Sequence, residues 1–86
     1  MYKLFIKKKK VKNKLYKFIN LRRDIKEKIE ILKENPRKEL NAHKLNGKLD
    51  GLWGCYLGYD IRIVYRIDED KKEIIIFDIG SHKIYT

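Results

Sequence analysis

The spacing of apolar residues changes from a helical to an alternating period near the middle of this 86-residue chain, and this change limits the folds it can adopt. Between Val11 and Leu32, apolar residues recur at helical spacing, with a predicted break and new helix start at Asn20. Asn35-Pro36 ends this part, because the residue before a proline avoids the helical region. Two amphipathic helices joined by a short link, an αα-hairpin, are therefore predicted.

The second half of the chain alternates between apolar and polar residues, which is typical of β-strands. Residues 52–57, 61–67 and 73–79 are predicted strands, and residues 1–6 are predicted to form a short strand before the helices. The segment 73–79 is apolar on both faces, as a central strand is. The predicted class is α+β: the N-terminal strand and the αα-hairpin pack on one face of a small twisted antiparallel sheet, in the order β-α-α-β-β-β. A chain of this length makes one domain, residues 1–86.

The positive charge is concentrated in the first half of the chain. The formal net charge is +10, and 17 of the 22 Lys and Arg residues lie in residues 1–48, with only 5 of the 12 Asp and Glu. Such a field attracts a polyanion: RNA, DNA or an acidic protein. A heat-adapted or AT-rich source can also enrich lysine, but that bias raises Glu together with Lys, and this chain has 17 Lys against 6 Glu. We therefore favour nucleic-acid contact, and the predicted RNA-binding residues are Lys7, Lys8, Lys9, Lys10, Lys44, Lys48 and Arg66.

The cysteine and histidine content limits covalent and metal chemistry. The single cysteine, Cys55, excludes an intrachain disulfide and a Cys-based zinc site. We expect it to be a small buried hydrophobe, and Trp53 on the same strand face to belong to the core. No metal and no cofactor are expected. The chain has no signal peptide and no long apolar run, so we expect a soluble cytoplasmic protein that makes no membrane contact.

Five polar side chains in the second half are candidates for a functional site. They offer an acid, a guanidinium, two imidazoles and a phenol, the groups that phosphodiester chemistry uses without a metal: Asp60, Arg62, His43, His82 and Tyr85. Arg62 alternates with the isoleucines of its predicted strand, so it faces an open, concave surface if the helices cover the isoleucine face. There it could bind a phosphate bidentately and stabilise a pentavalent phosphorus. The alternative is a solvated arginine paired with a cross-strand acid such as Asp78.

The other four candidates each have an ordinary structural explanation as well. Asp60 shares the strand face of Arg62 and could orient an imidazole, but an aspartate after a glycine is also common turn chemistry. His43 and His82 could act as acid or base near neutral pH, although a lone histidine is more often incidental. Tyr85 could stack on a base, or it could close the edge of the core.

The order of several short motifs resembles the RelE/ParE toxin superfamily of toxin–antitoxin systems, with YafQ-like features. The motifs are HKLNGKLDGLWG, then YDIRIVYRI, then IIIFDIG and a terminal His-x-x-Tyr. The resemblance implies the fold described above and a ribosome-dependent, metal-independent endoribonuclease that cuts mRNA to a 2′,3′-cyclic phosphate and a 5′-OH, and so inhibits translation. It also implies the ribosome, mRNA and a cognate acidic antitoxin as partners, with a toxin–antitoxin hetero-oligomer.

The resemblance also implies roles for the candidate residues. Arg62 matches the arginine of an R-hydrophobic-V-Y strand that contacts the phosphate and the transition state. His43, Asp60 and His82 resemble the His, Asp and His of the YafQ-type branch. Tyr85 stands where relatives keep a terminal Tyr or Phe, here one residue closer to the histidine.

The chain departs from both patterns in its GLW strand. It lacks the lysine pair of the RelE type and offers Gly54 and Tyr56 instead, and YafQ-type members carry a further histidine at the place of Tyr56. Two other functions therefore stay open. One is a ParE-like inhibitor of DNA gyrase, and the other is a catalytically inactive module that binds its antitoxin.

Overall fold

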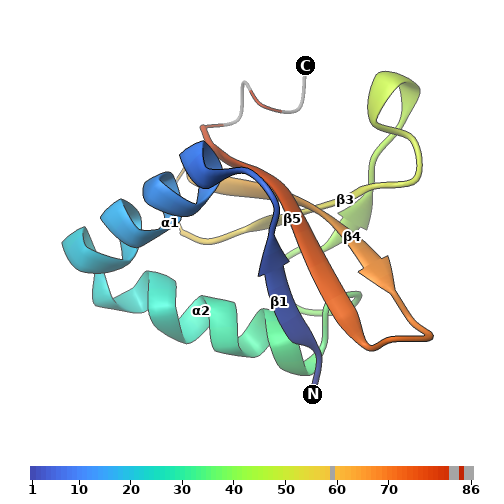
Figure 1. Ribbon diagram of the computed structural model, residues 1–86, viewed down its shortest axis with the longest axis horizontal. Coiled ribbons are helices and arrows are strands. Elements are labelled where there is room, and N and C mark those ends of the chain that lie inside the picture. The colour runs from blue at the N-terminus through green and yellow to red at the C-terminus, as the bar shows by residue number, and fades with distance from the viewer. Residues whose placement is uncertain (59, 82–83, 85–86) are drawn as a thin grey trace.

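Two helices cover one face of a five-stranded sheet (Figure 1). The computed structural model describes residues 1–58, 60–81 and 84. The sheet order is β1-β5-β4-β3-β2. In chain order the elements are β1 (Lys3–Ile6), α1 (Lys9–Leu21), α2 (Arg23–Glu34), β2 (His43–Lys44), a 3₁₀ turn (Gly47–Leu49), β3 (Trp53–Tyr56), β4 (Arg62–Asp68) and β5 (Glu73–Gly80).

The predicted α+β fold is confirmed, but the sheet is mixed where an antiparallel sheet was expected. β1 runs parallel to β5, with Ile6 paired with Ile76, while the other neighbouring strands are antiparallel. Consecutive strands joined by short turns are necessarily antiparallel, whereas β1 meets β5 from the far end of the sequence. A fifth strand, β2, also forms outside the four segments that were predicted as strands, because His43 and Lys44 pair with β3.

The two helices meet at Arg22, and the predicted break and helix cap at Asn20 are wrong. α1 continues to Leu21, and Arg22 has extended backbone angles between the helices. The Arg22 side chain forms an ion pair with Asp24 in the first turn of α2. Asp24 also lies where the positive end of the helix dipole favours an acid. This arrangement closes the αα-hairpin without a side-chain cap.

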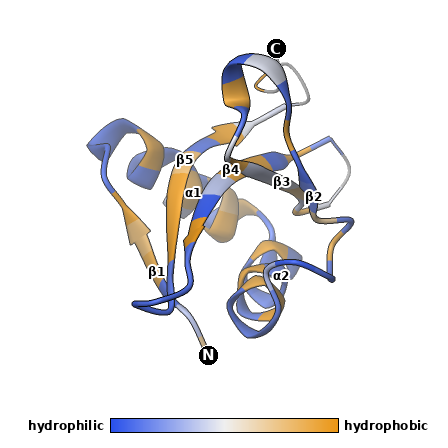
Figure 2. Cartoon of the chain, turned by 90° about the vertical axis from the view of Figure 1, so that its right-hand side faces the viewer, coloured by the Kyte–Doolittle hydropathy of each residue, from blue (hydrophilic) through white to orange (hydrophobic). Residues whose placement is uncertain are grey.

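The hydrophobic core lies between the helices and the sheet. The helices contribute Val11, Leu15, Ile25, Ile29 and Leu32, and the sheet contributes Cys55, Ile63, Tyr65, Ile74, Ile76 and Ile79, among others. Figure 2 shows the apolar stretches of β1 and β5 beside helices that are hydrophilic on their outer sides. The prediction that Cys55 is a buried hydrophobe is confirmed, and burial raises the pKa of its thiol to about 12. Trp53 packs against the core and is partly buried.

A β-bulge interrupts the pairing of β4 with β5. Val64 pairs with Asp78 but the next residue, Tyr65, pairs with Ile76, so Phe77 is an extra residue in β5. The bulge shifts the alternation by one residue. Ile79, instead of Asp78, then joins Ile76 in the core on the helix side.

Hydrogen bonds among polar side chains connect Tyr2, just before β1, to the loop between β4 and β5. The Tyr2 hydroxyl donates to Glu69 at 2.7 Å, and Arg37 and Lys72 donate to the same carboxylate at 2.8 and 2.7 Å. Hydrogen bonds from Lys72, Tyr2 and Arg37 lower the pKa of Glu69 to about 2.

We expect Glu69→Gln to lower the melting temperature slightly, and only where the carboxylate is charged. Because the folded-state pKa is depressed, the stabilisation is complete above the ordinary glutamate pKa of about 4.3 and is lost as pH falls towards about 2. Melting curves of both proteins between pH 7 and pH 2 would check this. Glu27→Gln, at an exposed position of α2, is the control, and a pH-independent difference for Glu69→Gln would contradict the prediction.

Neither helix in the described residues has the length and apolar character that crossing a membrane requires.

Candidate functional site

Two rows of paired residues place candidate side chains on the sheet face opposite the helices. In one row Tyr56 pairs with Arg62, which pairs with Gly80. In the next row His43 pairs with Gly54, Gly54 with Val64, and Val64 with Asp78. Directly paired residues share a face, and Arg62 and Val64 alternate with core residues of β4. The candidates Arg62 and His43 therefore come from different strands to the same face.

Arg62 is buried, so the prediction that it lies on an open surface is wrong. Its side chain is stacked on Tyr56, with the guanidinium carbon 3.4 Å from the ring centroid, and the residue is only 8% exposed. A cation over an aromatic face is held by the ring quadrupole as well as by packing. Among the described residues, the alternative ion pair between Arg62 and Asp78 is not observed, and Asp78 Oδ1 instead lies 3.4 Å from Lys14 Nζ of α1.

Ile84 lies close to the end of β5. Ile84 donates its backbone N–H to the carbonyl of Ser81 at 3.1 Å. A Cβ added at Gly80 would lie 3.0 Å from the Ile84 side chain, so the glycine permits this close approach. Gly80 is the partner of Arg62 across β4 and β5. Ile84 therefore lies near the strand partner of Arg62, while the predictions for His82 and Tyr85 lie outside the described residues.

His43 is exposed on β2, and its ring is oriented by the backbone. Its Nδ1 lies 2.8 Å from the carbonyl oxygen of Asn41. A carbonyl can only accept a hydrogen bond, so Nδ1 carries the proton of the neutral ring. Nε2 is then the basic nitrogen, which is the arrangement that a general base needs.

Asp60 does not lie on the strand face where the sequence placed it. It is exposed in the turn before β4, which begins at Arg62. Strand alternation therefore does not fix the direction of its side chain, and the turn explanation accounts for its position. The site on the sheet face is built from Arg62 and His43. Asp60 lies in the turn two residues before Arg62.

The predicted RNA-binding residues are distributed over several surfaces. Lys7 and Lys8 connect β1 to α1, Lys9 and Lys10 begin α1, and Lys48 lies in the 3₁₀ turn, all exposed. Arg66 is exposed on the same face of β4 as Arg62. Lys44 lies on the other face, because it pairs with Trp53 and its Nζ is 5.9 Å from the centroid of that ring.

Sequence reasoning did not identify Tyr56 as a site residue. It was noted only as a departure, yet its ring is the surface on which Arg62 stacks. The signal available in the sequence was that Tyr56 lies on the predicted strand that precedes the strand of Arg62. The two side chains can meet if these strands pair with Tyr56 opposite Arg62, as they do. Within residues 1–58, 60–81 and 84, no three His, Cys, Asp or Glu side chains gather in a way that could hold a metal ion.

Comparisons with known proteins agree with this fold. A family model described as a bacterial toxin of type II toxin–antitoxin systems, YafQ, matches residues 2–85. A copper-bound mutant toxin from Helicobacter pylori is 28% identical, with a TM-score of 0.68 and 98% of each chain covered. The archaeal RelE–RelB complex from Pyrococcus horikoshii includes a chain that is 28% identical, with a TM-score of 0.69 and 93% of each chain covered.

The YoeB–YefM complex from Staphylococcus aureus has a TM-score of 0.75 at 18% identity, covering 95% of this chain and 98% of that one, and this likeness concerns the fold alone. A comparison with curated proteins found no match.

Proposed function

The chain belongs to the YafQ family of bacterial toxins of type II toxin–antitoxin systems, and from this membership we propose that it is an endoribonuclease that cleaves mRNA on the ribosome without a metal. The observation that carries the proposal is the buried Arg62, stacked on Tyr56 and facing the same side of the sheet as His43. A cation and an imidazole base on one face of a strongly basic protein suit the cleavage of a phosphodiester.

The reaction proceeds by attack of the ribose on its own phosphate. A histidine, His43 or the predicted His82, takes the proton from the 2′-OH. The 2′-oxygen forms a bond to the adjacent phosphorus, and the bond from phosphorus to the 5′-oxygen breaks. The leaving oxygen takes a proton from the second histidine, which gives a 2′,3′-cyclic phosphate and a 5′-OH. The predicted role of Asp60 is to hold an imidazole, and that of Tyr85 is to orient the nucleotide.

Arg62 is proposed to stabilise the pentavalent phosphorus. Stacking on Tyr56 fixes the plane of the guanidinium before any substrate binds, and its planar fork of donors matches phosphate oxygens. Burial lowers the local dielectric, so each contact to developing negative charge is stronger than it would be in water. A preorganised donor of this kind loses little free energy in reorganisation during the reaction.

The regulatory partner is proposed to be a cognate acidic antitoxin that forms a hetero-oligomer with this chain. The net charge of +10 favours an acidic protein on electrostatic grounds. Two of the similar structures, the RelE–RelB and YoeB–YefM complexes, pair a toxin with an antitoxin.

Lys7 to Lys10 are proposed to bind ribosomal RNA through its phosphates. Lys9 and Lys10 occupy the first turn of α1, where the positive end of the helix dipole disfavours cations. Their placement is therefore not explained by helix stability, and it suits a contact with polyanion.

Replacing Lys7, Lys8, Lys9 and Lys10 together by glutamine should weaken ribosome binding and flatten its salt dependence. If each lysine neutralises one phosphate, the slope of log affinity against log salt should fall by about 3 to 4. Co-sedimentation with ribosomes at several salt concentrations measures both quantities. An unchanged affinity and slope would exclude this run as a contact. The control removes the same charge at four exposed or half-buried positions elsewhere, Lys26, Lys28, Lys38 and Lys71.

The proposed activity can be tested in a translating extract. The purified protein is added, and mRNA ends are mapped by primer extension, with and without ribosomes. New ends that require ribosomes and carry 2′,3′-cyclic phosphate and 5′-OH groups would support the proposal. Intact mRNA, together with a failure of DNA gyrase to supercoil plasmid, would point instead to a gyrase inhibitor. Intact mRNA with active gyrase would leave an antitoxin-binding module.

A further inference from the structure

We propose that Phe5 and Phe77 form a platform on which bases of single-stranded RNA stack, with Lys7, Lys8 and Arg66 binding the neighbouring phosphates. This inference rests on the proposed function, and it names a substrate-binding surface beyond the catalytic residues. We call these five residues the phenylalanine platform.

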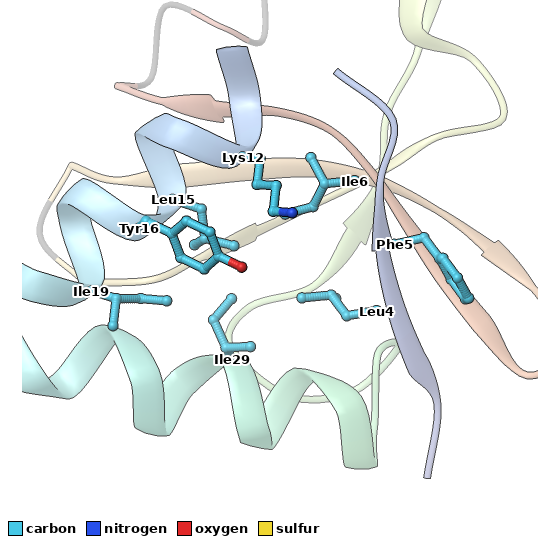
Figure 3. A pocket seen from close by; sticks show the side chains of 8 residues that line it. All are labelled: Leu4, Phe5, Ile6, Lys12, Leu15, Tyr16, Ile19 and Ile29. Atoms are coloured by element: carbon cyan, nitrogen blue, oxygen red, sulfur yellow. The ribbon is translucent and has the colours of Figure 1, made fainter. Parts of the chain in front are cut away.

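Both rings are exposed, although most apolar side chains of the sheet are buried. Phe5 is 44% exposed and Phe77 is 42% exposed. Figure 3 shows Phe5 pointing away from the helices, on the opposite side of β1 from Leu4 and Ile6. Phe5 pairs with Ile75, which pairs with Arg66, so these three residues share the outer face of the sheet.

Phe77 lies beside this row, two residues beyond Ile75 on β5. Phe77 follows Ile76, a core residue, so strand alternation places it on the outer face with Ile75. Its side chain lines a small cleft together with Ile75, Lys7 and Lys8. Phe77 is therefore a second exposed aromatic ring on the outer face. Ile75, buried next to both rings, gives the platform an apolar floor.

Lys7, Lys8 and Arg66 are the cations nearest the two rings, while the next row on this face, Lys3–Glu73–Asp68, holds one base and two acids. Lys7 and Lys8 are exposed and directly follow β1, whose last residue pairs with Ile76, the neighbour of Phe77. Arg66 is exposed on the other side of Ile75. An aromatic surface for bases and cations for phosphates is the combination by which sheet proteins bind single-stranded RNA.

The platform is continuous with the candidate catalytic site. Phe77 lies opposite the Val64–Tyr65 step of β4, and Arg62 lies farther along the same strand and face. From strand spacing and rise, the backbones at Phe77 and Arg62 are about 10 Å apart. A short single strand bound to the platform could therefore extend to this site. The two exposed rings favour RNA over an acidic protein as the occupant, because bases stack on aromatic rings.

The experiment measures binding of a labelled single-stranded RNA oligomer by fluorescence anisotropy, without ribosomes. Phe5→Leu and Phe77→Leu are made singly and together, and Tyr16→Leu, a 53% exposed aromatic on α1, is the matched control. A second oligomer carries abasic sites, so it keeps its phosphates and loses its bases. Leucine retains an apolar side chain at exposed positions, and thermal melts verify that each variant is folded.

Each platform substitution should weaken binding of the intact oligomer about tenfold, while Tyr16→Leu should not. The wild type should bind the abasic oligomer as weakly as the double variant binds the intact oligomer. Equal affinity of the wild type and the double variant for intact RNA would overturn the inference. So would a double variant that binds RNA normally and loses only its affinity for the acidic antitoxin. Cleavage by the wild type in the translating extract is scored separately, so failure of the platform is distinguishable from failure of the nuclease proposal.

Discussion

Replacing Arg62 by alanine should lower the rate of mRNA cleavage by about 10²- to 10³-fold, the usual cost of losing one donor to a developing charge. The loss should appear in the rate of the chemical step, because the guanidinium is proposed to act on the pentavalent phosphorus. Single-turnover cleavage on ribosomes programmed with a defined mRNA would measure this rate. Binding to ribosomes, measured separately, should change little, since Arg62 is only 8% exposed.

Two further variants make this prediction specific. Arg62→Lys keeps the positive charge but loses the planar fork that stacks on Tyr56, so its rate should lie between those of the wild type and the alanine variant. Arg23→Ala, at the exposed start of α2, should cleave as the wild type does. A folded Arg62→Ala variant that cleaves at the wild-type rate would show that the site has been assigned to the wrong residue.

Replacing Tyr65 by alanine should destabilise the protein by about 3–5 kcal/mol, the range for removing a large buried aromatic. Tyr65 is fully buried on the helix side of β4. Its hydroxyl donates to the carbonyl oxygen of Pro36, just after α2. The side chain thus fills the core and holds the end of the helical hairpin against the sheet. For a small domain this is a large part of the total free energy of unfolding.

Chemical denaturation followed by circular dichroism would measure the change. Tyr65→Phe keeps the ring and leaves the Pro36 carbonyl without its donor, so we expect a smaller loss of about 1–3 kcal/mol. Tyr16→Ala, at an exposed position of α1, should alter stability little. A Tyr65→Ala protein as stable as the wild type would mean that the hydroxyl and ring are not part of the contact that closes the core.

These two sets of variants separate chemistry from folding. Loss of Arg62 should slow cleavage in a protein that still melts cooperatively. Loss of Tyr65 should lower activity only as far as it lowers the folded fraction. The distinction follows from the two faces of β4, because alternate residues of one strand serve the core and the candidate site.

The helices, the three main strands and the chemical types at the site could be predicted from the sequence. The apolar stripe through Val11 and Leu15 and the alternation through Ile63 and Tyr65 are local patterns, and each specifies its element without knowledge of the rest of the chain. The same alternation correctly separated Arg62 from the core face. The joint at Arg22 was misplaced by two residues, because the residue at the N-cap of α2 is an arginine that makes no side-chain capping bond, whereas Asn20 is a typical capping residue.

The tertiary structure alone decided which strands meet, in which register, and what covers the arginine. β1 joins β5 in parallel across nearly the whole chain, and no local turn encodes that pairing. The bulge at Phe77 exists because β5 must present Ile79 to the core while remaining paired with β4. Arg62 is buried because the register of β3 brings Tyr56 beneath it. The period of apolar residues depends on neighbours in the sequence, whereas strand register and burial depend on packing between distant segments. The sequence by itself therefore determined the helices and strands, and only the packed sheet determined the geometry of the site.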